Sequence, residues 1–375
     1  MAHAYTPGLK VLEKTILTKT RRLPLKGTVK VKKGDMVKAE DIVASTELPG
    51  NVYPLNLANF LNVDPSEVVN FLVKKEGDVI NKGDVIAETK GLFGLFKRSV
   101  MSPRSGTLES VSKITGQAII REAPIPVNIN AYIDGIVDEV IPNEGVIIRT
   151  SAAFIQGIFG IGGERRGVLK VMVEKPTDTL TDDLIDDSCK GKVLVGGAFM
   201  TLEAFKKAEK TGVEGIIVGG FNYKDIKDIV GYDIGVAITG QEPINTTLII
   251  TEGFGEIHMA MQTFNLLKKH EGFVTSVNGA TQIRAGVIRP EVIICLAEKA
   301  ESKIQQAEVK GMDIGTVVRV IRAPYFGVLG EVMELPHGLQ KLESGSMARV
   351  AKVKLYDLNK EVMLPRANLE IYETN

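Results

Sequence analysis

The chain has 375 residues, of which 44% are apolar and 25% are charged, as in ordinary globular proteins. This length suggests two or three domains. Its 46 basic and 46 acidic side chains balance, which argues against a protein held mainly on nucleic acid. The first residues lack a signal peptide and no apolar run could span a bilayer, so a cytoplasmic protein with no membrane span is expected.

Residues 1–150 are predicted to be a β-rich domain in which one hairpin occurs twice. Gly34-Asp35-Met36-Val37 continues to Asp41 through Thr46, and Gly77-Asp78-Val79-Ile80 continues to Asp84 through Thr89. Each copy is typical of a strand, a tight Gly-Asp turn and a second strand. Nine basic residues against one acid between Lys10 and Lys33 indicate a solvated surface arm, or an arm that docks on phosphate or an acidic partner.

Around the second copy, Gly77-Asp78 and Gly83-Asp84 are followed by Pro103, Ser105-Gly106 and Thr107. This pattern resembles the biotinyl/lipoyl-carrier fold, the barrel-sandwich hybrid, over roughly residues 25–125. The resemblance implies a small β-barrel and places Lys90 near the lysine that carriers modify. Here, however, the hairpin tip is expanded and lacks the expected Asp-Lys or Met-Lys-Met. The tip either packs on a neighbouring domain or contacts a protein partner through Leu92, Phe93, Leu95 and Phe96.

A glycine run from Gly157 to Gly167 follows. Closely spaced glycines allow main-chain amides to surround an anion, and adjacent arginines favour phosphate. The order of a carrier-like barrel, this run and an α/β region is similar to that of the C-type subunit of the Rnf electron-transfer complex and of the flavin-binding subunit of respiratory complex I. That resemblance implies flavin mononucleotide, although Arg165-Arg166-Gly167 replaces the family's Phe-Pro-Thr. The alternative is an inter-domain turn. The candidate cofactor-binding residues are Gly160, Gly162, Gly163, Arg165 and Arg166.

Residues 151–297 are predicted to form a Rossmann-like α/β sandwich with a mostly parallel sheet. Continuous apolar strands begin near residues 193, 215, 234, 247, 274 and 292, and helices are expected over 202–210, 223–230 and 258–270. The carboxyl ends of parallel strands meet at one edge, where ligands bind. The polar loops there either form a crevice for a phosphorylated ligand or are ordinary βα turns. Their candidate residues are Thr251, Glu252, Gly253, Asn278, Gln282 and Arg284.

A polar linking helix is expected over residues 298–310, and residues 311–375 are β again. Gly315 through Gly330 resembles the KOW motif of NusG-type transcription factors, which implies an SH3-like barrel that binds RNA or protein. The candidate RNA contacts are Arg319, Arg322, Arg349, Lys352 and Lys354.

No complete catalytic set and no metal cluster is evident, and two cysteines are too few for a structural zinc site. We therefore expect a non-enzymatic adaptor or scaffold that works in a larger assembly through protein contacts and through RNA, and that is oligomeric. The alternative is an enzyme or sensor that binds a nucleotide, a flavin or another phosphorylated ligand in the central domain.

Overall fold

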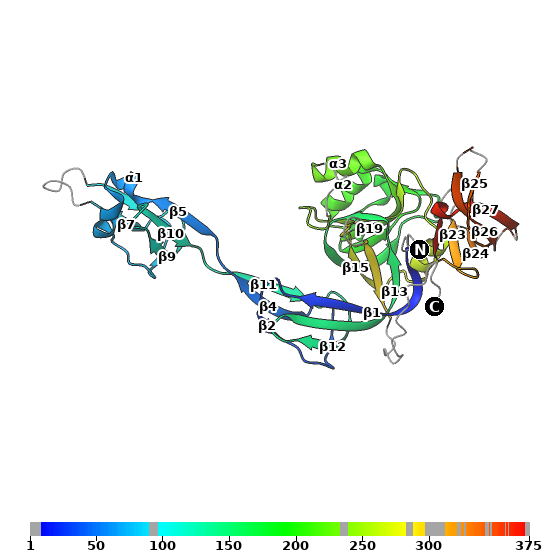
Figure 1. The fold of residues 1–375 in the computed structure, drawn as a ribbon, viewed down its shortest axis with the longest axis horizontal. Coiled ribbons are helices and arrows are strands. Elements are labelled where there is room, and N and C mark those ends of the chain that lie inside the picture. Colours follow the sequence, from blue (N-terminus) through cyan, green and yellow to red (C-terminus); the bar gives the residue numbers. More distant parts are fainter. Residues whose placement is uncertain are drawn as a thin grey trace.

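The computed structural model describes residues 9–89, 97–232, 239–282, 288–296, 312–320, 324–325, 328–341, 345, 347–356, 358 and 360–371. The chain is mostly β. Figure 1 shows an elongated molecule with a small β unit at one end, the largest sheet in the middle and a second β unit at the other end. The predicted tip residues Lys90, Leu92, Phe93, Leu95 and Phe96, together with Arg284 and Arg322, lie outside the described residues.

Each copy of the repeat contains two strands, but these strands pair with other parts of the chain and not with each other, so neither copy is the predicted hairpin. The first contains β3 (Met36–Val37) and β4 (Ile42–Leu48), and the second contains β6 (Val79–Ile80) and β7 (Val85–Glu88). Gly34 and Gly77 have the same positive φ of +92°, which glycine adopts at no steric cost. Asp35 and Asp78 each accept a hydrogen bond from the main-chain N–H three residues earlier. Identical turn chemistry therefore produces identical turns, although the two copies lie in different sheets.

The second copy belongs to what we call the distal unit, residues 52–121, at the left of Figure 1. Its sheet has the order β5–β10–β9–β6, with β5 (Val52–Asn56), β9 (Gly106–Val111) and β10 (Gln117–Arg121). The pair β7 and β8 (Ser99–Met101), helix α1 (Leu57–Leu61) and the 3-10 helix Pro65–Phe71 complete it. These elements enclose a core of their own around Leu57, Ile80, Ile86, Leu108 and Ile120, all fully buried.

The first copy belongs to a proximal unit, in which β4 lies between β2 (Thr28–Val29) and β11 (Ile125–Asn130). Strand β1 (Val11–Arg22) pairs antiparallel with β13 (Gly145–Gln156), and β12 (Gly135–Ile141) joins β13 to β3. The first half of the basic run is therefore a strand in a sheet and not a separate arm. The predicted domain boundary at residue 150 falls within β13, which extends from the proximal unit into the central sheet.

The central sheet corrects the predicted fold class. Its order is β14–β20–β19–β17–β15–β21–β22–β13. Along this path β15, β17, β19 and β20 are parallel to one another, and the short strands β16 (Thr179–Leu180) and β18 (Phe199–Met200) join β19 in parallel. In contrast, β14, β21, β22 and β13 join as antiparallel strands. The predicted Rossmann-like sandwich with a mostly parallel sheet is therefore wrong: the sheet is mixed, and it continues into the proximal unit. Its remaining strands are β14 (Phe159–Ile161), β15 (Glu164–Val171), β17 (Lys192–Val195), β19 (Gly215–Phe221), β20 (Thr247–Phe254), β21 (Val274–Asn278) and β22 (Glu291–Cys295).

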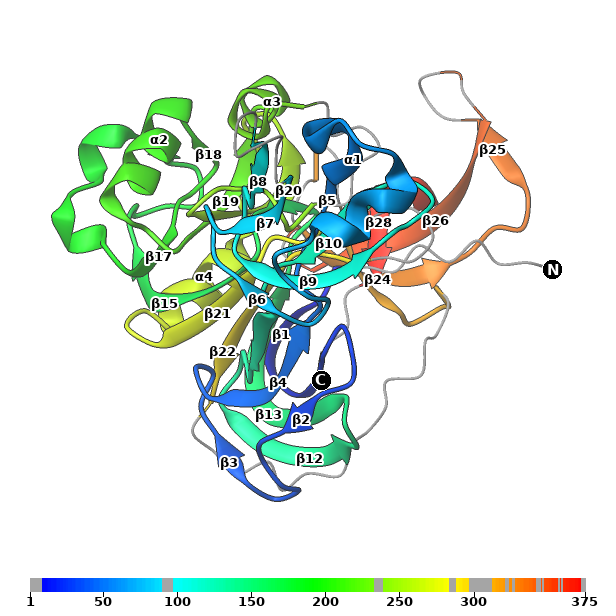
Figure 2. The same cartoon turned by 90° about the vertical axis from the view of Figure 1, so that its left-hand side faces the viewer.

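Helices cover both faces of the parallel strands. Alternate residues of β17, β19 and β20 point to opposite faces. Leu194, Ile216 and Leu248 pack with α2 (Leu202–Thr211) and α3 (Tyr223–Val230), whereas Val193, Ile217 and Ile249 pack with α4 (Met261–Lys269). In the turned view of Figure 2, β3 and β12 lie at the end of the molecule opposite α2 and α3. Most of the strand expected from residue 234 lies outside the described residues.

The C-terminal sheet has the order β25–β26–β24–β23–β28, and β27 pairs antiparallel with residues 350–355 of β26. Its core contains Val318, Val332, Ala351, Val353 and Leu355. The linking helix expected over residues 298–310 lies outside the described residues, and the KOW resemblance remains a prediction. The strands are β23 (Val317–Val320), β24 (Leu329–Glu334), β25 (Leu339–Lys341), β26 (Met347–Leu355), β27 (Lys360–Pro365) and β28 (Leu369–Ile371).

Candidate functional site

The glycine run meets two loops that lie far away in sequence. The N–H of Gly160 donates to Thr281 Oγ1 at 2.9 Å, and the N–H of Gly279 donates to the carbonyl of Gly162 at 3.1 Å. A Cβ on Gly279 would stand 2.1 Å from the carbonyl oxygen of Ile161, so the two backbones touch. The glycines at these positions therefore allow close packing of β14 against the loop after β21.

A carboxylate of the chain itself occupies the anion position of this loop. Glu242 Oε2 accepts hydrogen bonds from the N–H groups of Gly162 and Gly240, each at 2.8 Å, and Tyr232 donates to Oε1 at 3.1 Å. The side chain is almost enclosed, with Glu242 8% exposed. Burial, together with the Glu242 charge, raises the pKa of Tyr232. The amide that a phosphate or flavin would need at Gly162 is thus already bonded to Glu242.

The arginines beside the run are also engaged within the chain. They are neighbours in β15, so their side chains point to opposite faces. Arg165 Nη2 donates to the carbonyl of Ile244 at 3.2 Å. Arg166 pairs with Asp134 at 3.0 Å and with Glu40, both of the proximal unit. Gly163 accepts a hydrogen bond from Thr247 Oγ1 at 2.7 Å.

The structure does not bring the residues expected around the strand ends to one edge of the sheet. Because β21 is antiparallel to β15, Asn278 pairs with Glu164 at the amino end of β15, whereas Thr251, Glu252 and Gly253 lie toward the carboxyl end of the parallel strand β20. Thr251 Oγ1 donates to the carbonyl of Val218 at 3.3 Å within the sheet. Asn278 Oδ1 accepts from the N–H of Ala280 at 2.9 Å, and Gln282 exchanges main-chain bonds with Ile288. Gly253 lies in β20, beside Glu252.

Glu252 has a partner from the C-terminal sheet. Its Oε1 accepts from the N–H of Ala260 at 2.9 Å, and its Oε2 lies 3.6 Å from Arg319 Nη1 in β23. The two side chains are 1% and 6% exposed. A residue predicted for a ligand and one predicted for RNA are therefore buried against each other, and they join the central and C-terminal sheets. Sequence reasoning missed this pair because its members lie far apart along the chain, in separate predicted domains.

The remaining basic residues of the C-terminal sheet lie among acids. Lys354 is opposite Glu331 on one neighbouring strand and Glu361 on the other. Lys352 pairs with Glu361 at 2.7 Å, and this contact raises the pKa of Lys352 and lowers that of Glu361. Arg349 is exposed on the same strand. The face that carries Lys352 and Lys354 is therefore mixed in charge, without the basic excess that phosphate binding favours.

A serine–lysine contact also escaped the sequence analysis. Lys170 Nζ donates to Ser188 Oγ at 2.8 Å. The hydroxyl of Ser188 donates to Asp186, and hydrogen bonds from Ser188 lower the pKa of that carboxyl group. The lysine thus does not accept the hydroxyl proton, as a catalytic base must. The group caps the 3-10 helix Asp187–Cys189.

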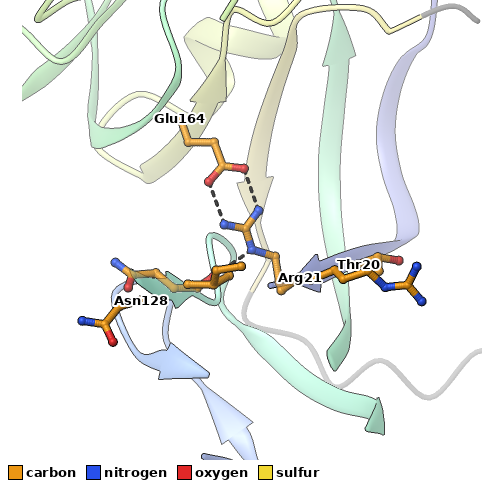
Figure 3. A pocket seen from close by; sticks show the side chains of 7 residues that line it. Thr20, Arg21, Asn128 and Glu164 are labelled. Atoms are coloured by element: carbon orange, nitrogen blue, oxygen red, sulfur yellow. Dashed lines mark hydrogen bonds and ion pairs between the residues drawn. The ribbon is translucent and has the colours of Figure 1, made fainter. Parts of the chain in front are cut away.

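A pocket of 420 Å³ lies between β1, β11 and the start of β15 (Figure 3). The Arg21 guanidinium closes one side. It makes two parallel bonds to Glu164, at 2.6 and 2.7 Å, and a third to the carbonyl of Asn130 at 2.7 Å. Arg21 also lies 5.3 Å from the centre of the Tyr132 ring. In the sequence, the basic run between Lys10 and Lys33 was the only feature that pointed to this pocket. The lining residues are Thr20, Arg21, Arg22, Asn128, Ile129, Asn130 and Glu164.

Comparison with known proteins adds no family: no protein-family model and no curated protein sequence matches this chain. Within the described part of the chain, no group of histidine, cysteine, aspartate and glutamate side chains is arranged to hold a metal ion. The helices that the structure describes include none that is long and apolar enough to cross a membrane.

Proposed function

We propose that the protein is an adaptor that contributes to a larger assembly by protein contacts, with the distal unit as one contact surface. The observation that carries this proposal is the construction of that unit. It has its own core, and it leaves and rejoins the proximal unit between β4 and β11, so it adds little to the core of the rest. In Figure 1 it projects far from the central sheet. A separate folded body held away from the main sheet is suited to reaching a second protein.

The outer end of the distal unit carries an exposed aromatic residue. Helix α1 contacts β7 and β8, the two strands that lead into and out of residues 90–96. On this helix Leu57, Ala58 and Leu61 are buried, but Phe60 is 62% exposed. Aromatic side chains, phenylalanine among them, are enriched in protein interfaces relative to the rest of the surface. Phe60 is therefore the described residue that we place at the centre of the contact.

Site-specific photo-crosslinking tests the proposal. A photoreactive amino acid at position 60 should link the full chain to one defined protein in cells of the source organism, whereas the same group at Met36 should not. Met36 is a matched control because it is exposed but lies on the proximal unit. The crosslinked protein, once purified, should bind the unmodified full chain.

Two further variants decide the outcome. Phe60→Asp should weaken binding of the purified partner by about tenfold or more, and Met36→Asp should change it by less than about twofold. Equal binding by both variants, or no specific crosslink from position 60, would refute the role of the distal unit.

A further inference from the structure

Strand β11 leaves one edge open toward the pocket. Among the described strands it pairs only with β4, and it ends the sheet β11–β4–β2. Main-chain groups of successive strand residues point to alternate sides. The N–H of Ala131 donates to Asp41 on the β4 side, whereas the carbonyl of Asn130 accepts from Arg21 on the pocket side. By this alternation, the main-chain N–H and carbonyl of Asn128 point into the pocket.

Pro126 supports the same assignment. Proline has no N–H to donate, so it is tolerated in an edge strand at positions whose main-chain groups point away from the neighbouring strand. Pro126 lies two residues before Asn128 and four before Asn130, so its main-chain groups point to the same open edge. An open edge of this kind is a template for pairing with another extended chain.

Strand β1 faces the pocket from the opposite side. The N–H of Leu23 donates to the main-chain carbonyl of Glu144, and this bond continues the pairing of β1 with β13. By alternation, the main chains of Thr20 and Arg22 point away from β13, and both residues line the pocket. The pocket is thus a slot between two open strand edges, joined at one end by the bond from Arg21 to Asn130 (Figure 3).

The charges around the slot favour an acidic occupant. Glu164 is neutralised by its two bonds to Arg21. The Arg22 side chain is 59% exposed and contacts Glu144 at 3.3 Å, so it remains open to an additional carboxylate. The lining thus contains two arginines against one glutamate, and Asn128 and Asn130 contribute uncharged amides. A positive rim beside an open edge selects extended segments with acidic side chains.

We propose that this slot binds an extended acidic peptide segment of a partner protein, which pairs with the open edge of β11 and places a carboxylate against Arg22. The inference rests on the proposed adaptor function and names a second contact surface for it. Main-chain bonds supply affinity in this mode of recognition, and side chains supply the choice of sequence.

The test separates main-chain pairing from side-chain contact at one position. Peptides are first selected from a displayed random library on the immobilised full chain, and each selected peptide is then synthesised. Asn128→Ala removes the side-chain amide and should keep affinity within about twofold, whereas Asn128→Pro removes the pocket-facing N–H as well and should weaken these peptides by about tenfold or more. The proline should be accommodated because Pro126 already occupies the strand and Val127 is extended. Arg22→Glu should weaken acidic peptides about tenfold.

Hydrogen exchange gives an independent readout in the unmodified protein. The Asn128 amide should exchange quickly in the free chain and slowly with the selected peptide bound. Unchanged exchange at Asn128, equal affinity in Asn128→Pro, or selection of no peptide would overturn the inference. A concentration-dependent dimer abolished by Asn128→Pro would also overturn it, because a second copy would then be the occupant.

The distal unit provides the control that separates the two proposals. A chain in which residues 49–124 are replaced by Asn-Gly should still bind the selected peptides, because β11 and β1 are retained. If the shortened chain binds peptide but position 60 of the full chain gives no specific crosslink, only the role of the distal unit fails. If the crosslink forms but the slot binds no peptide, only the present inference fails.

Discussion

Several side chains that the sequence marks as ligand-binding instead bind other parts of the chain. Glu252 and Arg166 each pair with a charged residue from a distant segment. Residue types and spacing predict that the amides of the glycine run surround an anion. In the structure the Gly162 amide bonds to a carboxylate of the chain itself, and the Gly160 amide bonds to a threonine hydroxyl. The sequence does not show that the anion is Glu242, because that depends on which loop lies opposite the glycine run in three dimensions.

The Glu242 contacts make a prediction about stability. Glu242→Ala should lower the free energy of unfolding of the central sheet by about 2–4 kcal/mol, because it removes the carboxylate that accepts from the buried amide of Gly162 and the half-buried amide of Gly240. Glu242→Gln should cost less, since its amide oxygen still accepts a hydrogen bond. Hydrogen exchange at Gly162 and Gly240 measures the effect, and unchanged exchange in Glu242→Ala would contradict it.

The pair of Glu252 and Arg319 should behave as a coupled unit. Arg319→Met removes a charged partner from a buried carboxylate, which costs about 3–5 kcal/mol. The double variant Arg319→Met with Glu252→Gln should be more stable than the sum of the single effects predicts, because it buries no unpaired charge. Denaturant unfolding of the four proteins gives the coupling energy. Simple additivity would show that the contact does not hold the two sheets together.

At the scale of elements, the sequence predicts strands better than their directions. Continuous apolar runs correctly placed β17, β19 and β20, which are parallel, and also β21 and β22, which are antiparallel. An apolar run reports burial on both faces, but it carries no information about the direction of the neighbouring strand. Strand β14 lies within the glycine run, where no apolar pattern marks it.

The repeated turn, by contrast, is determined by the glycine and aspartate of each copy, and this gives a prediction for both copies. Gly34→Ala and Gly77→Ala should each destabilise their own unit by about 1 kcal/mol or more, because an alanine at φ +92° is strained even though no atom lies within 4 Å of its Cβ. Gly338→Ala is the control, since its Cβ also has open space and its φ is not positive. It should change stability by less than about 0.5 kcal/mol.

Peptide-level hydrogen exchange can follow β3 and β6 separately in these variants. Each alanine should speed exchange in its own copy of the repeat and leave exchange in the other copy unchanged, because the two copies lie in different sheets. Faster exchange in both copies of the repeat after a single substitution would mean that the proximal and distal units unfold together.

At the scale of the whole molecule, the distal unit is an insertion into a β-hairpin. Leu48 at the end of β4 pairs with Ile125 at the start of β11. The connecting chains run side by side, since the N–H of Glu122 donates to the carbonyl of Asn51 at 2.9 Å. The sequence repeat does not reveal this arrangement. Two similar segments suggest one barrel, yet the two copies belong to two units with separate cores.

Excision of the unit should therefore leave the rest of the molecule folded. When residues 49–124 are replaced by Asn-Gly, Leu48 and Ile125 flank a two-residue turn whose geometry matches paired antiparallel strands. We expect the shortened chain to be soluble, with hydrogen exchange in β13, β17 and β19 unchanged, because the fully buried residues of these strands pack within the proximal unit and the central sheet. A much shorter excision, of residues 28–47, should be destructive, since it removes Val43 from the proximal core and separates β11 from its partner. Faster exchange throughout the central sheet after the 49–124 excision would show that the distal unit supports the fold, and its role as a projecting contact surface would then lose its structural basis.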